Sequence, residues 1–95
     1  MIHLTVILTA KNEADVSKIA ELLQEQSRLT KQEPGCIRFE VYHSQEDPKL
    51  FILNERWESQ SALDIHRKAR ACSEIYFPQV VPLVDRAPHP CDLIQ

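Results

Sequence analysis

The stretch CIRFEVYHSQEDPKLFILNERW, residues 36–57, decides the fold of this chain. Residues 36–43 and 50–57 are rich in β-branched, aromatic and aliphatic residues, which is typical of strands, and the turn between them, SQEDP at 44–48, is rich in Asp and Pro. Two adjacent strands joined by a short turn form a hairpin. The preceding EPGC, residues 33–36, holds the only glycine of the chain, and a Pro-Gly pair is a strong turn signal.

Upstream of the hairpin the sequence predicts a strand and then a helix. Residues 2–9 alternate as a strand does. Asn12 is placed to cap a helix over 13–32, whose first turn carries acidic residues where the helix dipole favours them. On a 3.6-residue wheel this helix presents one inward stripe with polar positions within it: Val16, Ile19, Ala20, Leu23, Ser27 and Thr30.

Downstream of the hairpin the sequence predicts two helical segments and then a short strand. A second helix opens at Ser59 or Ser61 and runs to about Arg70. A further helical stretch over 73–84 is interrupted by two prolines, each tolerated only in a first turn or at a break. We expect CDLIQ, residues 91–95, to form a short last strand.

The resulting order, β-α-β-β-α-β, is that of the ferredoxin-like α+β fold, a single domain over 1–95 with both helices on one face of an antiparallel sheet. The other face of that sheet is left bare. In the strand over 50–57, Leu50 and Ile52 point one way and Phe51 points the other, so both faces are apolar. Sheets covered on both faces have this pattern, and we expect a homodimer packed sheet to sheet. The alternative is one apolar but solvated face.

Composition and charge exclude several partners. The chain is 43% hydrophobic and 26% charged with a net charge of −3, which is typical of a globular protein. Its eleven Lys and Arg are scattered, so we expect no nucleic acid partner. No apolar run approaches about 18 residues, and the N-terminus lacks a leader pattern, so we expect no membrane partner and a cytoplasmic location. The three cysteines and four histidines lack metal-ligand spacing, and we expect no metal.

His66 is the residue that points to a function. On the second helix it lies in the middle of the arc that faces the sheet. A buried imidazole needs a partner or a cavity, because an unsatisfied buried polar group costs about 1–3 kcal/mol. Glu55 and Trp57 alternate onto one face of the third strand, and Ser27 adds a polar group beneath the first helix. These residues predict a mostly apolar pocket between sheet and helices. The alternative is a core histidine with satisfied hydrogen bonds.

Three stretches, EPGCIRFEVY (33–42), DPKLFILNERWESQSALDIH (47–66) and PLV (82–84), resemble the antibiotic biosynthesis monooxygenase family. The family includes quinol and anthrone oxygenases that use no metal or flavin, enzymes that process a phosphorylated quorum-sensing signal, and haem-degrading enzymes. The resemblance implies a pocket inside each subunit and a homodimer whose two sheets form an α+β barrel.

This resemblance predicts a cofactor-independent monooxygenase that oxidises a small quinol or polycyclic dihydroxy-aromatic with O₂. In such an enzyme the substrate supplies the electrons, so the protein needs a base, an aromatic slot and exclusion of water. We expect His66 to take the phenolic proton and Glu55 to orient it or stabilise its cation. Trp57, Phe39 and Tyr42 would wall the substrate ring. No cofactor is predicted.

Two other functions stay open. An isomerase or degrading enzyme for a phosphorylated quorum-sensing-type molecule needs an anion site, for which Arg70, Arg38 or Arg56 are candidates. A non-catalytic module would bind a small ligand without turning it over. Haem degradation is disfavoured, because that branch of the family has an asparagine on the first strand, whereas here Asn12 follows the strand.

Overall fold

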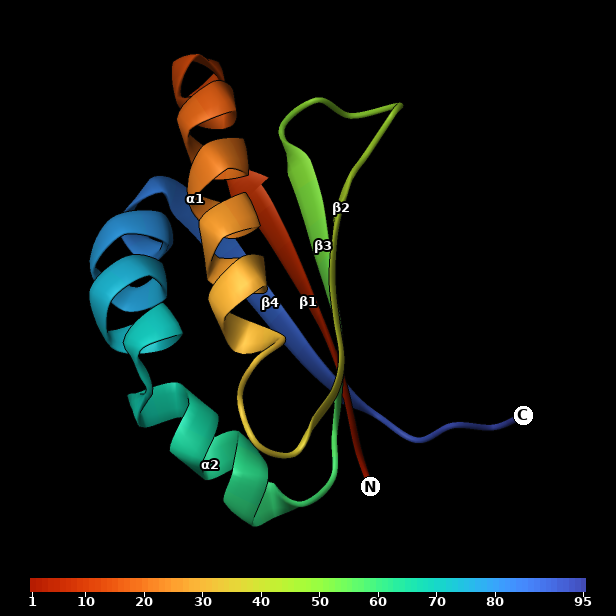
Figure 1. The fold of residues 1–95 in the computed structure, drawn as a ribbon. Helices are drawn as coiled ribbons and strands as arrows, with labels where there is room; N and C mark the ends of the chain where they lie inside the picture. Colours follow the sequence, from red (N-terminus) through yellow and green to blue (C-terminus); the bar gives the residue numbers. More distant parts are fainter.

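The computed structural model describes residues 1–95 and confirms the predicted ferredoxin-like α+β fold. Four strands pair antiparallel in the order β2-β3-β1-β4, and the helices all lie on one face of this sheet (Figure 1). In chain order the elements are β1 (Ile2–Ala10), η1 (Glu13–Asp15), α1 (Val16–Thr30), β2 (Cys36–His43), β3 (Leu50–Trp57), α2 (Gln60–Lys68), the π-helix η2 (Ala71–Val80), η3 (Val81–Leu83) and β4 (Val84–Cys91).

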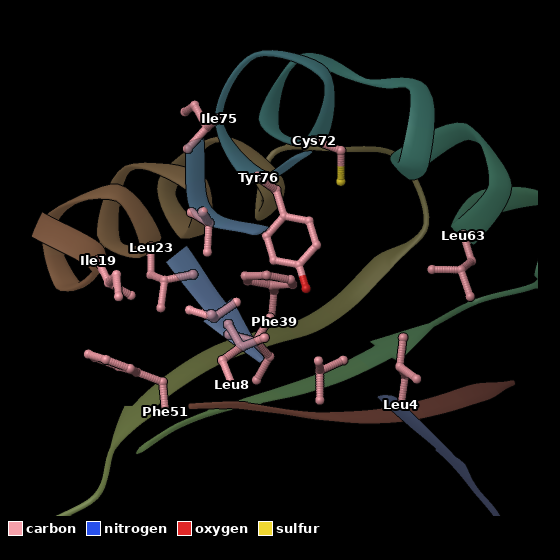
Figure 2. Packing of buried hydrophobic residues seen from close by; sticks show 14 of the residues in the cluster. Leu4, Leu8, Ile19, Leu23, Phe39, Phe51, Leu63, Cys72, Ile75 and Tyr76 are labelled. Atoms are coloured by element: carbon pink, nitrogen blue, oxygen red, sulfur yellow. The ribbon is translucent and has the colours of Figure 1, made fainter. Parts of the chain in front are cut away.

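The core lies between the sheet and the helices. On β1 and β3 every second residue from Leu4 and Phe51 onward is buried beneath the helices, while the residues between them on the open face are half-buried. Figure 2 shows Leu23 of α1 and Tyr76 of η2 pointing toward Phe39 and Leu8 on the sheet. The largest side chains with less than 2% exposure are Trp57, Phe39 and Phe51. This alternation leaves one face of the sheet without a covering layer.

Helix α1 differs from its predicted stripe at one polar position. Asn12 caps the preceding 3-10 turn as expected, accepting a backbone N–H through its side chain at 2.9 Å. The buried polar residues in the second half of α1 are Thr30, as predicted, and Gln26, whereas Ser27 is only half-buried. Helix α1 packs against η2 as well as against the sheet, and Leu22 and Leu29 are partly buried against the core. This second contact turns the inward stripe toward Gln26.

The helical region after β3 begins as predicted and continues differently. Ser59 caps α2, its Oγ accepting the N–H of Ala62 at 3.1 Å. Pro78 lies inside η2 rather than at a break, and Pro82 lies in the first turn of η3. Proline has no N–H to donate and disrupts the regular hydrogen-bond pattern of an α-helix, and here the segment that contains Pro78 has π-helical rather than α-helical bonding. None of the helices combines the length and the apolar character that a membrane crossing requires.

The predicted position of the last strand is wrong. Residues 92–95 lie outside the sheet, and β4 instead pairs with β1 from Val84, opposite Ala10, to Cys91, opposite His3. Pro88 and Pro90 obscure this strand in the sequence. They are tolerated because β4 is an edge strand, where a missing N–H can face away from the neighbouring strand.

Candidate functional site

The turn before β2 packs against the start of α2. Gly35 has a φ of +81°, and its carbonyl accepts the N–H of Glu58 at 2.8 Å. A Cβ on Gly35 would lie 2.5 Å from the Cβ of Ala62, so a glycine is needed both for the backbone conformation and for this close approach. The turn thereby carries Glu33 to the inner side of α2.

His66 sits between two hydrogen-bonding partners. Its Nδ1 lies 2.6 Å from Oε1 of Glu33, and its Nε2 lies 3.3 Å from Sγ of Cys72. A carboxylate accepts, so Nδ1 donates to Glu33 and Nε2 keeps its lone pair. Burial raises the pKa of the Cys72 thiol to about 12, with the Glu33 and Glu55 carboxylates adding to the shift. Cys72 is therefore a thiol that donates weakly to Nε2.

The imidazole of His66 is enclosed by aromatic rings. Its centre lies 4.4 Å from that of Trp57 and 6.0 Å from that of Phe39, and all three residues are buried. Trp57 Nε1 donates to Oε1 of Glu55 at 2.9 Å. Glu33 rather than Glu55 is thus the hydrogen-bond partner of His66, which corrects one of the two roles predicted for Glu55.

A small cavity of about 30 Å³ adjoins His66 between the sheet, α2 and η2. Its buried side carries the carboxyl of Glu55, whose pKa is raised by burial, an effect that the Trp57 hydrogen bond partly offsets. Gln26 lines the cavity too, and its Oε1 is buried without a hydrogen-bond partner. The residues that line the cavity are Leu4, Gln26, Leu53, Glu55, Leu63, His66, Arg67, Cys72, Tyr76, Phe77 and Arg86.

The outer end of the cavity is formed by exposed side chains, Arg67, Phe77 and Arg86. Arg86 donates from Nε to the hydroxyl of Tyr76 at 2.6 Å. Burial raises the pKa of Tyr76, although the neighbouring guanidinium of Arg86 opposes this shift. The cavity therefore has a buried acid, a buried histidine and a phenol inside, and positive charge at its mouth.

The structure brings together some of the predicted site residues and separates others. His66 and Glu55 line the cavity. Trp57 and Phe39 pack against the imidazole of His66 but do not line the cavity. Ser27 instead lines a groove between α1 and β2.

Tyr42 and Arg70 lie away from the cavity. Tyr42 lies on the open face of the sheet, because it is three positions from the buried Phe39 and side chains alternate along a strand. It is half exposed there, and its hydroxyl donates to Glu40 at 2.7 Å. Arg70 follows the end of α2 and forms an exposed ion pair with Glu74 at 3.1 Å. Neither residue lines this cavity.

Sequence reasoning missed Glu33, Gln26, Tyr76 and Arg86. Gln26 carried a usable signal, because it lies three and seven positions after Leu23 and Ile19 on the helix wheel. Glu33 lies in a turn and Tyr76 in a π-helix, where the periods of strands and α-helices do not apply. Arg86 lies in β4, a strand that the sequence pattern does not predict at that position.

Comparisons with known proteins agree with this architecture. The profile of the antibiotic biosynthesis monooxygenase family matches residues 1–76. The uncharacterized protein YjcS of Bacillus subtilis (strain 168) is 29% identical over 66 residues, which cover 70% of this chain and 63% of that protein, less than two thirds of its length.

Solved structures extend the likeness over the whole chain. A crystal structure of an antibiotic biosynthesis monooxygenase has a TM-score of 0.89 at 25% identity and covers 100% of both chains. SnoaB, a cofactor-independent oxygenase from Streptomyces nogalater, has a TM-score of 0.84 over 99% of this chain and 93% of its own, at an identity of 8% that supports the fold alone. The chain belongs to the antibiotic biosynthesis monooxygenase family.

Proposed function

We propose that this protein is a cofactor-independent monooxygenase that oxidises a small quinol or related dihydroxy-aromatic with O₂. The observation that carries the proposal is the pair of the buried His66 and the partly buried Glu33, with Nδ1 and Oε1 2.6 Å apart and with His66 and Cys72, the partner of Nε2, both lining the cavity. Membership of a monooxygenase family supports the reaction class. The likeness to a cofactor-independent oxygenase shows that this fold can hold such an enzyme, and it supports no more than that.

His66 is the base in this proposal. Glu33 holds the Nδ1 proton, so the lone pair of Nε2 is the free one, and in the unliganded protein only the weak thiol donor of Cys72 meets it. A phenol is a stronger donor than a thiol and displaces it. When the phenolic proton moves to Nε2, the carboxylate of Glu33 stabilises the imidazolium that forms.

The substrate supplies all the electrons of the reaction. A hydroquinone with one O₂ gives a hydroxyquinone and one water: one oxygen atom enters the ring, the other leaves as water, and the ring loses four electrons. Deprotonation makes the ring electron-rich enough to react, so the protein has only to remove a proton, hold the ring and exclude water. Glu55, whose pKa is raised by burial, keeps its proton to higher pH than an ordinary carboxyl and can donate a hydrogen bond to a substrate oxygen.

A substrate ring enters only when the mouth of the cavity moves. The cavity has about 30 Å³ in the absence of a ligand, whereas a cavity that holds benzene has about 150 Å³. Arg67, Phe77 and Arg86 are the exposed lining residues. The hydrogen bond to Tyr76 holds Arg86 in place, so the side chains that move outward in this proposal are those of Arg67 and Phe77. Ligand binding therefore enlarges the site at its solvent side.

Oxygen uptake with a panel of quinols and anthrones tests the proposal. The protein is first treated with a chelator, and a control without protein gives the rate of spontaneous oxidation. We expect uptake to survive chelation, and His66→Ala to lower the rate about 100-fold or more, the usual contribution of general acid–base catalysis. Glu33→Gln should lower it less. His43→Ala is the matched control, since His43 stacks on Phe51 at 4.3 Å outside the cavity.

Two results would count against the proposed function. Full activity in His66→Ala would place the base elsewhere. Absence of uptake above the spontaneous rate across the panel would favour the isomerase or the ligand-binding alternative.

We also propose that two copies associate through the open face of the sheet. Ile7, Leu50 and Ile52 lie half-buried on that face, and Tyr42 is half exposed beside them. The Nε of Arg56 on the same face is buried and has no hydrogen-bond partner. A second copy packed on this face can supply the missing acceptor. A covered apolar face is typical of an interface.

A further inference from the structure

Arg86 differs from most arginines of this chain in having no carboxylate partner. Four of the six arginines lie within 4.0 Å of an acidic side chain, namely Arg28 with Glu25, Arg38 with Glu40, Arg67 with Asp64 and Arg70 with Glu74. Arg56 lies on the open face of the sheet, opposite Arg38 in register. Arg86 is therefore the one arginine at the cavity without an ion pair within 4.0 Å, and its charge acts on the Glu55 carboxyl only at longer range.

The guanidinium of Arg86 is held in place by the protein, and its two terminal nitrogens remain available for a ligand. Arg86 lies opposite Leu8 in register, on the face of β4 that the helices cover. Its Nε donates to the hydroxyl of Tyr76 at 2.6 Å, and its central carbon lies 5.6 Å from the centre of the Tyr76 ring. This hydrogen bond fixes the plane of the group, while the two terminal nitrogens make no hydrogen bond to the protein. A guanidinium oriented in this way matches the two oxygens of a carboxylate.

A second positive charge lies at the same mouth. Arg67, in the last turn of α2, lines the cavity, and its ion pair with Asp64 is long at 3.8 Å and exposed. Such exposed pairs contribute little and are easily exchanged for a better partner. The only carboxyl group among the lining residues is that of Glu55. The mouth of the cavity is thus positive, and the hydrogen-bonding groups that suit a hydroxylated ring lie farther in.

We infer that the ligand of this cavity is a hydroxylated aromatic acid, whose carboxylate is bound by the terminal nitrogens of Arg86, with Arg67 beside them, while its ring faces His66. The inference rests on the proposed function and narrows its substrate class. It makes Arg86 a specificity-determining residue: a neutral quinol of the same shape loses the contact at the mouth but keeps those inside.

Anaerobic titration calorimetry tests the inference separately from turnover. The probes are 2,5-dihydroxybenzoate and its methyl ester, which share a hydroquinone ring and differ in the negative charge. We expect wild-type protein to bind the acid about tenfold more tightly than the ester, as a charge-assisted hydrogen bond provides. Arg86→Gln should abolish this preference. Arg86→Lys should retain part of it, because the positive charge remains but the planar pair of N–H donors that matches two carboxylate oxygens is lost.

Arg28→Gln is the matched control for these variants. Arg28 is an exposed arginine of α1 that does not line the cavity, so its loss should leave the preference for the acid unchanged. Equal binding of the acid and the ester by wild-type protein overturns the inference, as does absence of binding of the acid. An equal loss of affinity for both probes in Arg86→Gln overturns it too, because that result indicates a structural role alone.

Oxygen uptake separates this inference from the proposed function. A preference for the acid that depends on Arg86, without uptake for any quinol, refutes the oxygenase and leaves the carboxylate site standing. Uptake with neutral quinols and no preference for the acid refutes the carboxylate site and leaves the oxygenase standing.

Discussion

Replacing Gly35 with alanine tests whether the turn before β2 organises the site. The backbone there has a φ of +81°, which costs a residue with a side chain about 1 kcal/mol relative to glycine. The new Cβ would also lie 2.5 Å from the Cβ of Ala62, more than 1 Å inside the usual contact distance of about 3.5–4.0 Å. Forced separation of packed groups costs about 1–3 kcal/mol. We therefore expect Gly35→Ala to lower the free energy of unfolding by about 2–4 kcal/mol.

Thermal and urea unfolding followed by circular dichroism measures this loss. For a chain of this size it corresponds to a fall in Tm of about 10–20 °C. Ala62→Gly, made in both backgrounds, separates the two causes, because it removes the clash but not the backbone strain. We expect the double variant to be more stable than the sum of the single changes by about 1 kcal/mol or more. A loss below about 0.5 kcal/mol in Gly35→Ala, or strict additivity with Ala62→Gly, would refute the reasoning.

Three further predictions concern charge, association and thiol reactivity. Burial raises the pKa of Glu55, so the folded protein binds its proton more tightly than the unfolded chain does; this stabilisation is complete below pH 4.5 and is lost as the pH rises through the raised pKa. Glu55→Gln should therefore gain stability relative to wild type in urea unfolding as the pH rises above 4.5, and a difference that does not change with pH would contradict this. Ile52→Glu, at the centre of the open face, should halve the mass measured by light scattering, whereas Ile65→Glu on the exposed side of α2 should not; an unchanged mass in the first variant argues against the interface. Ellman's reagent at about pH 8 should modify the exposed Cys91 quickly, the half-buried Cys36, whose pKa burial raises to about 11, more slowly, and the buried Cys72, whose pKa burial raises to about 12, only after unfolding; rapid reaction of all three thiols in the folded protein would contradict this.

The parts of the fold that could be predicted are those with a regular local pattern. The hairpin over 36–57 alternates on both sides of an Asp-Pro turn, and its bounds in the structure agree with the prediction. The last strand was misplaced because Pro88 and Pro90 removed the local signal, while the tertiary pairing with β1 that accepts them is not visible in sequence. The position of β4 at the edge of the sheet therefore outweighs the low strand propensity of its prolines.

The candidate site was predictable only where it depends on element faces. The inward direction of His66 followed from the helix wheel, and that of Glu55 from strand alternation. Glu33 lies 33 positions from His66, and nothing local links a turn residue to a helix that forms later in the chain. Tyr76 lies in a π-helix, to which a wheel of 100° per residue does not apply, so its contact with Arg86 had no sequence signal.

The prolines of β4 also determine how sheets of different molecules can join. A strand added outside β4 would forgo the N–H groups of Pro88 and Pro90, two donors that its ladder needs, whereas Cys36–His43 of β2 contains no proline. Growth by strand addition is therefore disfavoured at one end of the sheet. A unit with only one receptive edge can pair once with a second unit, and the pair then presents no receptive edge to a third. The two prolines thus protect this small, apolar sheet from open-ended fibrillar polymerisation.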